Sequence, residues 1–249
     1  MEVTRIFDLL DHAKQYFPCE DMLCGKENGM WTPYSTERYI TLVNSLSYGL
    51  LHLGVEKGDR IASISNNRPE WNILDMAILQ VGAIHVSIYP TISESDYQYI
   101  LNDAQVKMIF VSGWELLRKI ESVIESIPNL KDKVYTFRNL RGYRHFNEVI
   151  DLGIANPSPE RLAEIKTSIL PDDVVTLIYT SGTTGNPKGV EYTHRALVLH
   201  SMMSSMVDTF AICERDTVMP IVPMFHVNAW GIPYTSVNVG ANQVLIGPQ

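Results

Sequence analysis

Short apolar segments alternate with amphipathic segments between residues 60 and 137, and this alternation constrains the fold more than any other feature of the chain. Strands are predicted over Arg60–Ser65, Ala83–Tyr89, Lys107–Ser112 and Lys133–Phe137, with helices over Glu70–Val81, Ser93–Asp103 and Trp114–Ile127 between them. Strands that alternate with helices pair in parallel, because each helix returns the chain to the same end of the sheet. We therefore expect an α/β fold with layered, doubly wound, mostly parallel sheets and flanking helices.

The segments on either side extend this pattern. Upstream, helices are predicted over Ile6–Phe17 and Thr36–Leu53, with a loop or short β-ribbon between them. Downstream, strands are predicted over Asp173–Thr180, Thr217–Val222 and Gln243–Ile246, with helices over Thr193–Phe210 and His226–Val239. The Pro- and polar-rich stretch 156–171 is either an internal boundary or a long connection.

Composition and charge limit the function classes. Apolar residues form 45% of the chain and charged residues 19%, which is ordinary for a globular protein and excludes a disordered one. Because the net charge is −8 and phosphates need a basic surface, a nucleic-acid binder is disfavoured. Three cysteines form no disulfide framework, and neither a secretory signal nor a transmembrane segment is recognisable. We expect a cytoplasmic protein, which is compatible with peripheral membrane contact and with a homodimer.

One segment directly after the apolar strand 173–180 has the composition of a phosphate-binding loop. Four hydroxyl side chains, three glycines and one lysine lie between Thr180 and Gly189. Glycines allow the backbone to approach an anion and to aim successive N–H groups at it, while Lys188 supplies a compact positive charge. Ligands of open α/β sheets bind at the carboxyl ends of the strands, where this segment lies. We interpret it as a polyphosphate cradle.

Three other patterns fit this segment less well. A Walker A loop requires Ser or Thr after the Gly-Lys pair, whereas Lys188 follows Pro187 and precedes Gly189. The dinucleotide pattern GxGxxG is also absent. A plain Gly- and Ser-rich turn explains the glycines but not the hydroxyls and the lysine.

The twelve residues Tyr179–Val190 resemble the phosphate-binding signature of the adenylate-forming superfamily, which includes acyl-CoA synthetases, luciferases and peptide-synthetase adenylation domains. Similar stretches occur at 54–61, 67–71 and 82–86, so that the resemblance runs from about Thr36 to the end of the sequence. The stretch Val222–Tyr234 is most similar to medium- and long-chain fatty acyl-CoA synthetases.

The resemblance implies ATP-dependent activation of a fatty acid to acyl-AMP and pyrophosphate, followed by transfer of the acyl group to coenzyme A. It implies the following site residues: ATP phosphates bound by Thr180, Ser181, Gly182, Thr183, Thr184, Gly185 and Lys188; Mg²⁺ bound by Thr180; catalysis by His226 and Lys188; and the acyl group bound by Phe225, Val227 and Trp230. The substrates and partners it implies are small molecules.

The structural alternatives for individual residues remain open. A histidine near a strand end is usually structural, but the place of His226 directly after Phe225 favours function. For Trp230, plain core packing stays an alternative to an acyl-binding role. If 226–239 is one helix, Trp230 lies one turn after His226 on the same face. We expect Met202, Met203 and Met206 to belong to the core of the preceding helix and Arg68 to be a solvated surface charge.

Members of the superfamily are usually much longer than 249 residues, and their later motifs are not found here. We expect residues 1–249 to be the N-terminal part of a large AMP-binding domain, without the C-terminal lid domain. Two functional alternatives remain: adenylation of another acid, such as an aryl or amino acid, or a catalytically inactive nucleotide-binding fragment. An ordinary P-loop ATPase is disfavoured by the Lys188–Gly189 junction.

Overall fold

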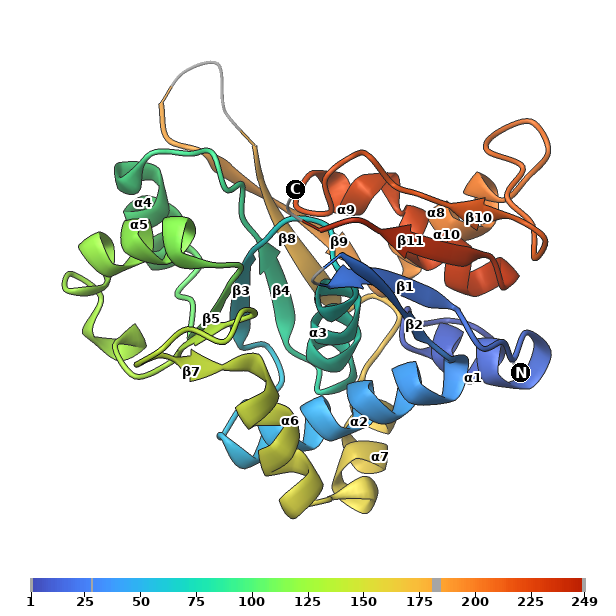
Figure 1. Cartoon of the computed structure of the whole chain (residues 1–249), viewed down its shortest axis with the longest axis horizontal. Coiled ribbons are helices and arrows are strands. Elements are labelled where there is room, and N and C mark those ends of the chain that lie inside the picture. Colours follow the sequence, from blue (N-terminus) through green and yellow to red (C-terminus); the bar gives the residue numbers. More distant parts are fainter. Residues whose placement is uncertain (1, 28, 181–184, 248–249) are drawn as a thin grey trace.

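The computed structural model describes residues 2–27, 29–180 and 185–247 (Figure 1). Within them, seven strands form one sheet in the order β7-β6-β5-β3-β4-β8-β9, and four form a second sheet in the order β10-β11-β1-β2. The larger sheet contains β3 (Arg60–Ile64), β4 (Ile84–Ser87), β5 (Met108–Val111), β6 (Val134–Thr136), β7 (Arg144–His145), β8 (Val174–Thr180) and β9 (Lys188–Thr193). The smaller contains β1 (Leu23–Glu27), β2 (Met30–Tyr34), β10 (Thr217–Val218) and β11 (Asn242–Leu245).

The helices flank these sheets. They are α1 (Asp8–Tyr16), α2 (Thr36–His52), α3 (Pro69–Gln80), α4 (Glu94–Asp103), α5 (Trp114–Ile124), α6 (Phe146–Ala155), α7 (Pro159–Ser168), α8 (His194–Ser204), α9 (Val227–Trp230) and α10 (Ile232–Val239), with a 3₁₀ turn at Pro128–Leu130. Pro69 occupies the first turn of α3, where its missing N–H leaves no bond unmade. The Ser35 hydroxyl accepts a hydrogen bond from the Arg38 N–H and caps α2.

The larger sheet is covered by helices on both faces. In β3, Ile61 belongs to the core that contains α2, α3 and α6, whereas Ala62 and Ile64 belong to the core that contains α4 and α5. Neighbouring side chains of a strand point to opposite faces, so a strand buried on both sides becomes apolar throughout. The predicted doubly wound, mostly parallel α/β architecture is confirmed.

Several predicted elements differ from the structure. The irregular region after residue 137 contains β7, α6 and α7, and β9 is an additional strand that pairs antiparallel with β8. The helix predicted to reach Phe210 ends at Ser204, and the strand predicted over 217–222 is limited to Thr217–Val218. The first four residues of β9 are exposed, so the strand lacks the apolar alternation by which strands are recognised.

Helices α2 and α6 pack closely against each other at two glycines. A Cβ added to Gly49 would lie 1.9 Å from the Val149 carbonyl oxygen, and one added to Gly153 would lie 1.8 Å from the Ser45 carbonyl oxygen. The two backbones therefore approach to a distance that only glycine permits at these positions.

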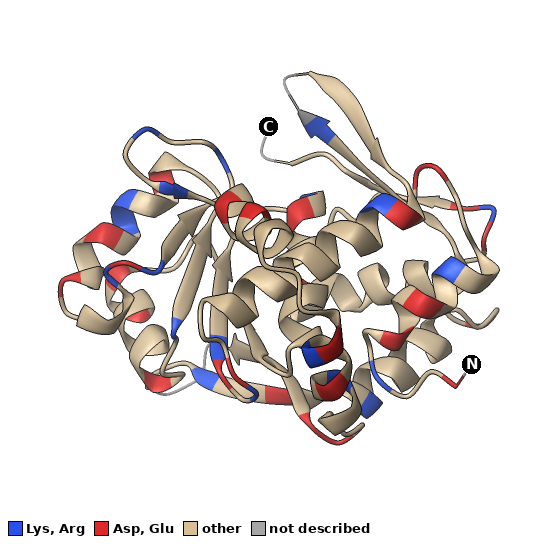
Figure 2. Cartoon of the chain, turned by 90° about the horizontal axis from the view of Figure 1, so that it is seen from below, with Lys and Arg blue, Asp and Glu red and all other residues tan. Residues whose placement is uncertain are grey.

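Charged residues are distributed over the exterior. In Figure 2, basic and acidic residues are interspersed over the visible helices and loops rather than gathered on one face. None of the helices formed by the described residues is long and apolar enough to cross a membrane.

Candidate active site

The carboxyl ends of β4 and β8 lie side by side in the larger sheet. The two strands are parallel, with Ser87 opposite Ile178. Two residues further along each strand, Tyr89 and Thr180 therefore reach the same edge of the sheet. This is the edge at which ligands of parallel sheets bind.

Strands β8 and β9 pair antiparallel, and they contain the first residue, Thr180, and the last two residues, Lys188 and Gly189, of the predicted phosphate-binding segment (Figure 1). Thr180 and Lys188 are cross-strand neighbours, and both are exposed. Gly185 has a φ of +93°, with open space around it. Ser181, Gly182, Thr183 and Thr184 lie outside the described residues. Among those that are described, no hydrogen bond or ion pair engages the Lys188 ammonium, which leaves it free to meet an anion.

His226 meets this edge through Tyr89. The Tyr89 hydroxyl and His226 Nδ1 share a hydrogen bond, and the two ring centroids are 5.5 Å apart. The centroid of the Phe225 ring lies 5.0 Å from that of the Tyr89 ring. Burial raises the pKa of Tyr89 above that of a free phenol, so its hydroxyl remains protonated at neutral pH. His226 is exposed, as a residue that contacts a substrate must be.

Tyr89 was not among the residues selected from the sequence. It closes the apolar strand 83–89 immediately before Pro90, and its aromatic side chain is expected there for packing reasons alone. The available signal is its position at the carboxyl end of a buried parallel strand, where polar atoms face ligands.

The segment after His226 is not the right-handed helix that was predicted. Residues 227–231 have φ values between +47° and +69°, which is the left-handed region, and the right-handed helix α10 begins only at Ile232. Left-handed conformation costs L-residues roughly 1–2 kcal/mol each. The helix predicted from His226 is therefore wrong over residues 227–231, so Trp230 is not placed by a right-handed helical turn. Surrounding contacts must offset this strain, because four of the five residues are not glycine.

Trp230 makes contacts other than those of His226. It is 50% exposed, its ring stacks on Phe210 at 6.5 Å between centroids, and its carbonyl oxygen accepts a hydrogen bond from His200 Nε2 at 2.9 Å. Val227 and Phe225 are half-buried. The methionines predicted to be core are exposed: Met202 by 39%, Met203 by 60% and Met206 by 59%. The helix ends at Ser204, so it does not bury its last methionines against the body of the protein.

The described residues do not by themselves make a magnesium site. No group of three or more His, Cys, Asp or Glu side chains within residues 2–27, 29–180 and 185–247 could hold a metal. Thr180 offers one hydroxyl oxygen, whereas Mg²⁺ requires six oxygen ligands, commonly carboxylates, phosphates and water.

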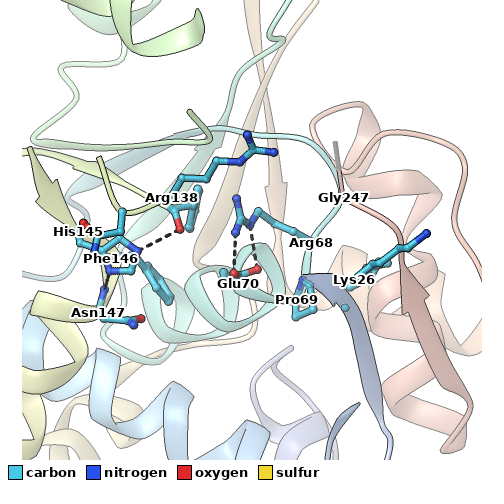
Figure 3. A pocket seen from close by; sticks show the side chains of 13 residues that line it. Lys26, Arg68, Pro69, Glu70, Arg138, His145, Phe146, Asn147 and Gly247 are labelled. Atoms are coloured by element: carbon cyan, nitrogen blue, oxygen red, sulfur yellow. Dashed lines mark hydrogen bonds and ion pairs between the residues drawn. The ribbon is translucent and has the colours of Figure 1, made fainter. Parts of the chain in front are cut away.

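A sizeable cavity lies away from these residues. It has a volume of about 670 Å³ and lies between β1, the start of α3 and the segment that joins β6 to α6 (Figure 3). Arg68 donates hydrogen bonds to Glu70 at 2.8 Å and 2.6 Å, and its guanidinium lies over the Phe137 ring. Only 12% of the Arg68 side chain is exposed, so its expected role as a solvated surface charge is wrong. None of the predicted site residues that the structure describes lines this cavity.

Comparison with known proteins gives the chain its family. Residues 20–249 match the model of AMP-binding enzymes. A long-chain-fatty-acid–CoA ligase of Thermus thermophilus is 35% identical over 251 residues, covering 100% of this chain and 44% of the relative. A medium-chain-fatty-acid–CoA ligase of Ectopseudomonas oleovorans is 33% identical over 250 residues, covering 98% and 44%. The chain thus spans less than half the length of these relatives.

Solved structures agree on the fold. The anthranilate CoA ligase AuaEII in complex with anthranoyl-AMP superposes with a TM-score of 0.82 at 24% identity, covering 100% of this chain and 47% of that chain. A long-chain-fatty-acid-CoA ligase of Archaeoglobus fulgidus superposes with a TM-score of 0.80 at 22% identity, covering 99% and 47%. Since the family model covers most of the sequence and the fold agrees with it, the chain belongs to the AMP-binding enzyme family of adenylate-forming enzymes.

Proposed function

We propose that this chain is the nucleotide-binding part of an ATP-dependent ligase that activates a fatty acid and transfers it to coenzyme A. A carboxylate oxygen attacks the α-phosphorus of ATP, the bond to pyrophosphate breaks, and acyl-AMP forms. The thiol of coenzyme A then attacks the acyl carbon and releases AMP. The observation that carries the proposal is the meeting of the Thr180–Lys188 hairpin and the Tyr89–His226 pair at one edge of the sheet.

The residues of the hairpin account for binding of the triphosphate. Lys188 and the amides and hydroxyls of Ser181, Gly182, Thr183, Thr184 and Gly185 would hold its phosphates, since the overall charge of −8 repels ATP and attraction must be local. His226 would lie beside the carboxylate and the α-phosphate and donate a hydrogen bond to the developing charge. Phe225, Val227 and Trp230 would contact the acyl chain.

A fatty acid is preferred over other acids because the two ligases compared in sequence act on long- and medium-chain fatty acids by name. Activation of an aryl acid remains the second candidate, favoured by the fold shared with an anthranilate CoA ligase. An amino acid as the substrate and an inactive nucleotide-binding fragment are the remaining alternatives.

Further parts of the proposal rest on the sequence alone. We propose that residues 1–249 form the N-terminal part of the large AMP-binding domain, with an internal boundary near 156–171, and that the lid domain is supplied elsewhere in the protein. Mg²⁺ would bind mainly through the phosphates, with Thr180 as a contributing ligand. A cytoplasmic location agrees with the three free cysteines. A homodimer and peripheral membrane contact remain predictions.

Fatty-acid-dependent exchange of pyrophosphate into ATP tests the proposal, with the protein expressed from its complete gene. Lys188→Ala should slow the exchange by roughly a hundredfold, because a preorganised charge at the phosphates is lost. Lys131→Ala removes an exposed lysine outside the site and is the matched control. Exchange that requires no carboxylic acid, or that is equally fast in Lys188→Ala, would refute the proposal.

A further inference from the structure

A chain of buried polar side chains runs from the larger sheet to the left-handed turn. Ser63 Oγ and His85 Nε2 are 2.7 Å apart, and His85 Nδ1 lies 2.6 Å from Asp75 Oδ1. The Tyr234 hydroxyl donates to Asp75 Oδ2 at 2.9 Å, and Asn228 Nδ2 donates to the Tyr234 hydroxyl at 3.2 Å. This series of hydrogen bonds thus joins five elements, β3, β4, α3, α10 and α9, through the Asp75 carboxylate.

The first three members have the atoms of a hydrolytic triad but cannot act as one. Ser63 and His85 are 0% exposed and Asp75 is 1% exposed, so no substrate reaches the serine. Buried polar groups of this kind are expensive unless they are satisfied, and once satisfied they fix one arrangement of the elements that carry them. We therefore ask which elements these three residues hold in place.

Asp75 bonds to both elements that carry the Tyr89–His226 pair. Through His85 it is joined to β4, whose chain reaches Tyr89 four residues later. Through Tyr234 and Asn228 it is joined to the turn that begins directly after His226. Burial and the negative charge of Asp75 raise the pKa of Tyr234 well above that of a free phenol, so Tyr234 stays a donor.

Packing adds a second link between the same elements. Trp71 of α3 contacts the His85 ring at 5.1 Å between centroids and shares a buried cluster with Met224 and Ala229, which lie on either side of His226. Trp71 and Ala229 are each no more than 1% exposed. These contacts and the hydrogen-bonded chain together offset the strain of the left-handed residues 227–231.

We propose that Asp75, His85, Tyr234 and Asn228 are positioning residues, which set the place of His226 against Tyr89 by holding the left-handed turn to strand β4. The proposal rests on the proposed function only in assigning His226 to the site. The arrangement itself can be tested without any substrate.

The test compares three variants of this chain by NMR with labelled histidine and tyrosine. Tyr234→Phe removes one hydroxyl from the chain of hydrogen bonds. Asn228→Gly removes the amide while retaining a residue that accepts positive φ, and it serves if Tyr234→Phe does not fold. Tyr39→Phe is the matched control, because it removes an equally buried hydroxyl that bonds instead to the Asn72 carbonyl oxygen. The His226 signals are identified by their loss in His226→Gln.

In Tyr234→Phe and Asn228→Gly, we expect the His226 Nδ1 resonance to shift and the cross-peaks between the Tyr89 and His226 rings to be lost. In Tyr39→Phe, both should stay as in the unaltered chain. Unchanged His226 signals in both network variants would overturn the proposal, and so would an equal change in Tyr39→Phe. If pyrophosphate exchange fails but the two network variants show the expected NMR changes, the proposed function is refuted and the positioning role is retained.

Discussion

The buried side chain of His194 stays uncharged because of its surroundings. It is 1% exposed, its Nδ1 accepts a hydrogen bond from the Ile6 N–H at 3.1 Å, and its ring meets Phe7 edge-on. Desolvation, only partly opposed by Asp8, lowers its pKa from 6.5 to about 3. His194 lies at the start of the helix predicted over Thr193–Phe210, and in the structure it is the first residue of α8.

The depressed pKa of His194 predicts acid sensitivity. Between about pH 6.5 and 3 the unfolded chain binds a proton that the folded chain rejects, so stability should fall as pH decreases, by about 1.4 kcal/mol per pH unit. His194→Gln retains an acceptor oxygen but does not titrate. When the pH is lowered from 6.5 to about 5, the free energy of unfolding of this variant should fall by about 2 kcal/mol less than that of the unaltered chain. Urea unfolding at the two pH values measures the difference. The same pH dependence in both proteins would contradict this, and exposed His52→Gln is the control.

Asn67 holds the segment that leads to His226. Its Nδ2 donates to the Pro220 and Val222 carbonyl oxygens at 2.8 Å and 2.9 Å, and its Oδ1 accepts from the Met224 N–H at 2.7 Å. Asn67→Ala should lower the free energy of unfolding by roughly 1–3 kcal/mol, because three backbone groups lose their partner. Thermal unfolding measures the effect. Asn139→Ala, at an exposed asparagine, should change it little.

Among the elements, the sequence predicted those helices and strands whose apolar residues recur with a clear period. The helices and strands from β3 to β6 were predicted within a few residues, because buried strands and amphipathic helices differ in period. Strand β9 was missed because its pairing is decided by β8 rather than by its own exposed residues. The left-handed turn was missed because Val227, Asn228 and Ala229 adopt an unfavourable conformation that only tertiary contacts select.

The same limit applies to the candidate site. Lys188, Thr180 and His226 were identified by residue type and motif, which the sequence displays directly. The partnership of His226 with Tyr89 depends on the register between β4 and β8 and on a turn 137 residues further along the chain. No local pattern contains that information.

The contact between α2 and α6 gives a prediction of unusual sign. Gly→Ala in a helix normally stabilises by up to about 1 kcal/mol. At Gly49 or Gly153 the added methyl group would overlap a carbonyl oxygen of the other helix, so each substitution should destabilise by roughly 1–3 kcal/mol or more. Ile154 is 60% exposed and lies in α6, next to Gly153. Ile154→Ala should therefore change the free energy of unfolding by no more than about 0.5 kcal/mol. Denaturant unfolding that shows stabilisation in Gly153→Ala would refute the close packing.

Considered as a whole, the molecule exposes several large apolar side chains that lie close together in sequence. At the end of α8 and in the segment after it, Met203 is 60% exposed, Met206 59%, Val207 83% and Phe210 45%. Exposed apolar side chains that gather in one region mark surfaces that associate, and we refer to these four residues as the patch. The net charge of −8 opposes association in general but is not concentrated at this patch.

We therefore expect this 249-residue chain to self-associate as its concentration rises. Replacing Met203 and Val207 together by lysine should shift the apparent mass measured by light scattering toward that of a monomer. Met30→Lys is the control, because Met30 is 72% exposed but lies in β2, outside the patch. A chain that remains monomeric at all concentrations, or that loses association in Met30→Lys, would contradict the prediction.

The smaller sheet has a consequence for the order of folding. Strand β1 pairs in parallel with β11, placing Leu23 opposite Gln243, about 220 residues away in sequence. At roughly 5–20 residues per second, the ribosome supplies β11 some 10–40 s after β1. During that time the β1–β2 hairpin has no neighbour on one side. Because long-range pairings form slowly, closure of this sheet should be the last event in folding, after the parallel core of β3, β4 and β5 has formed.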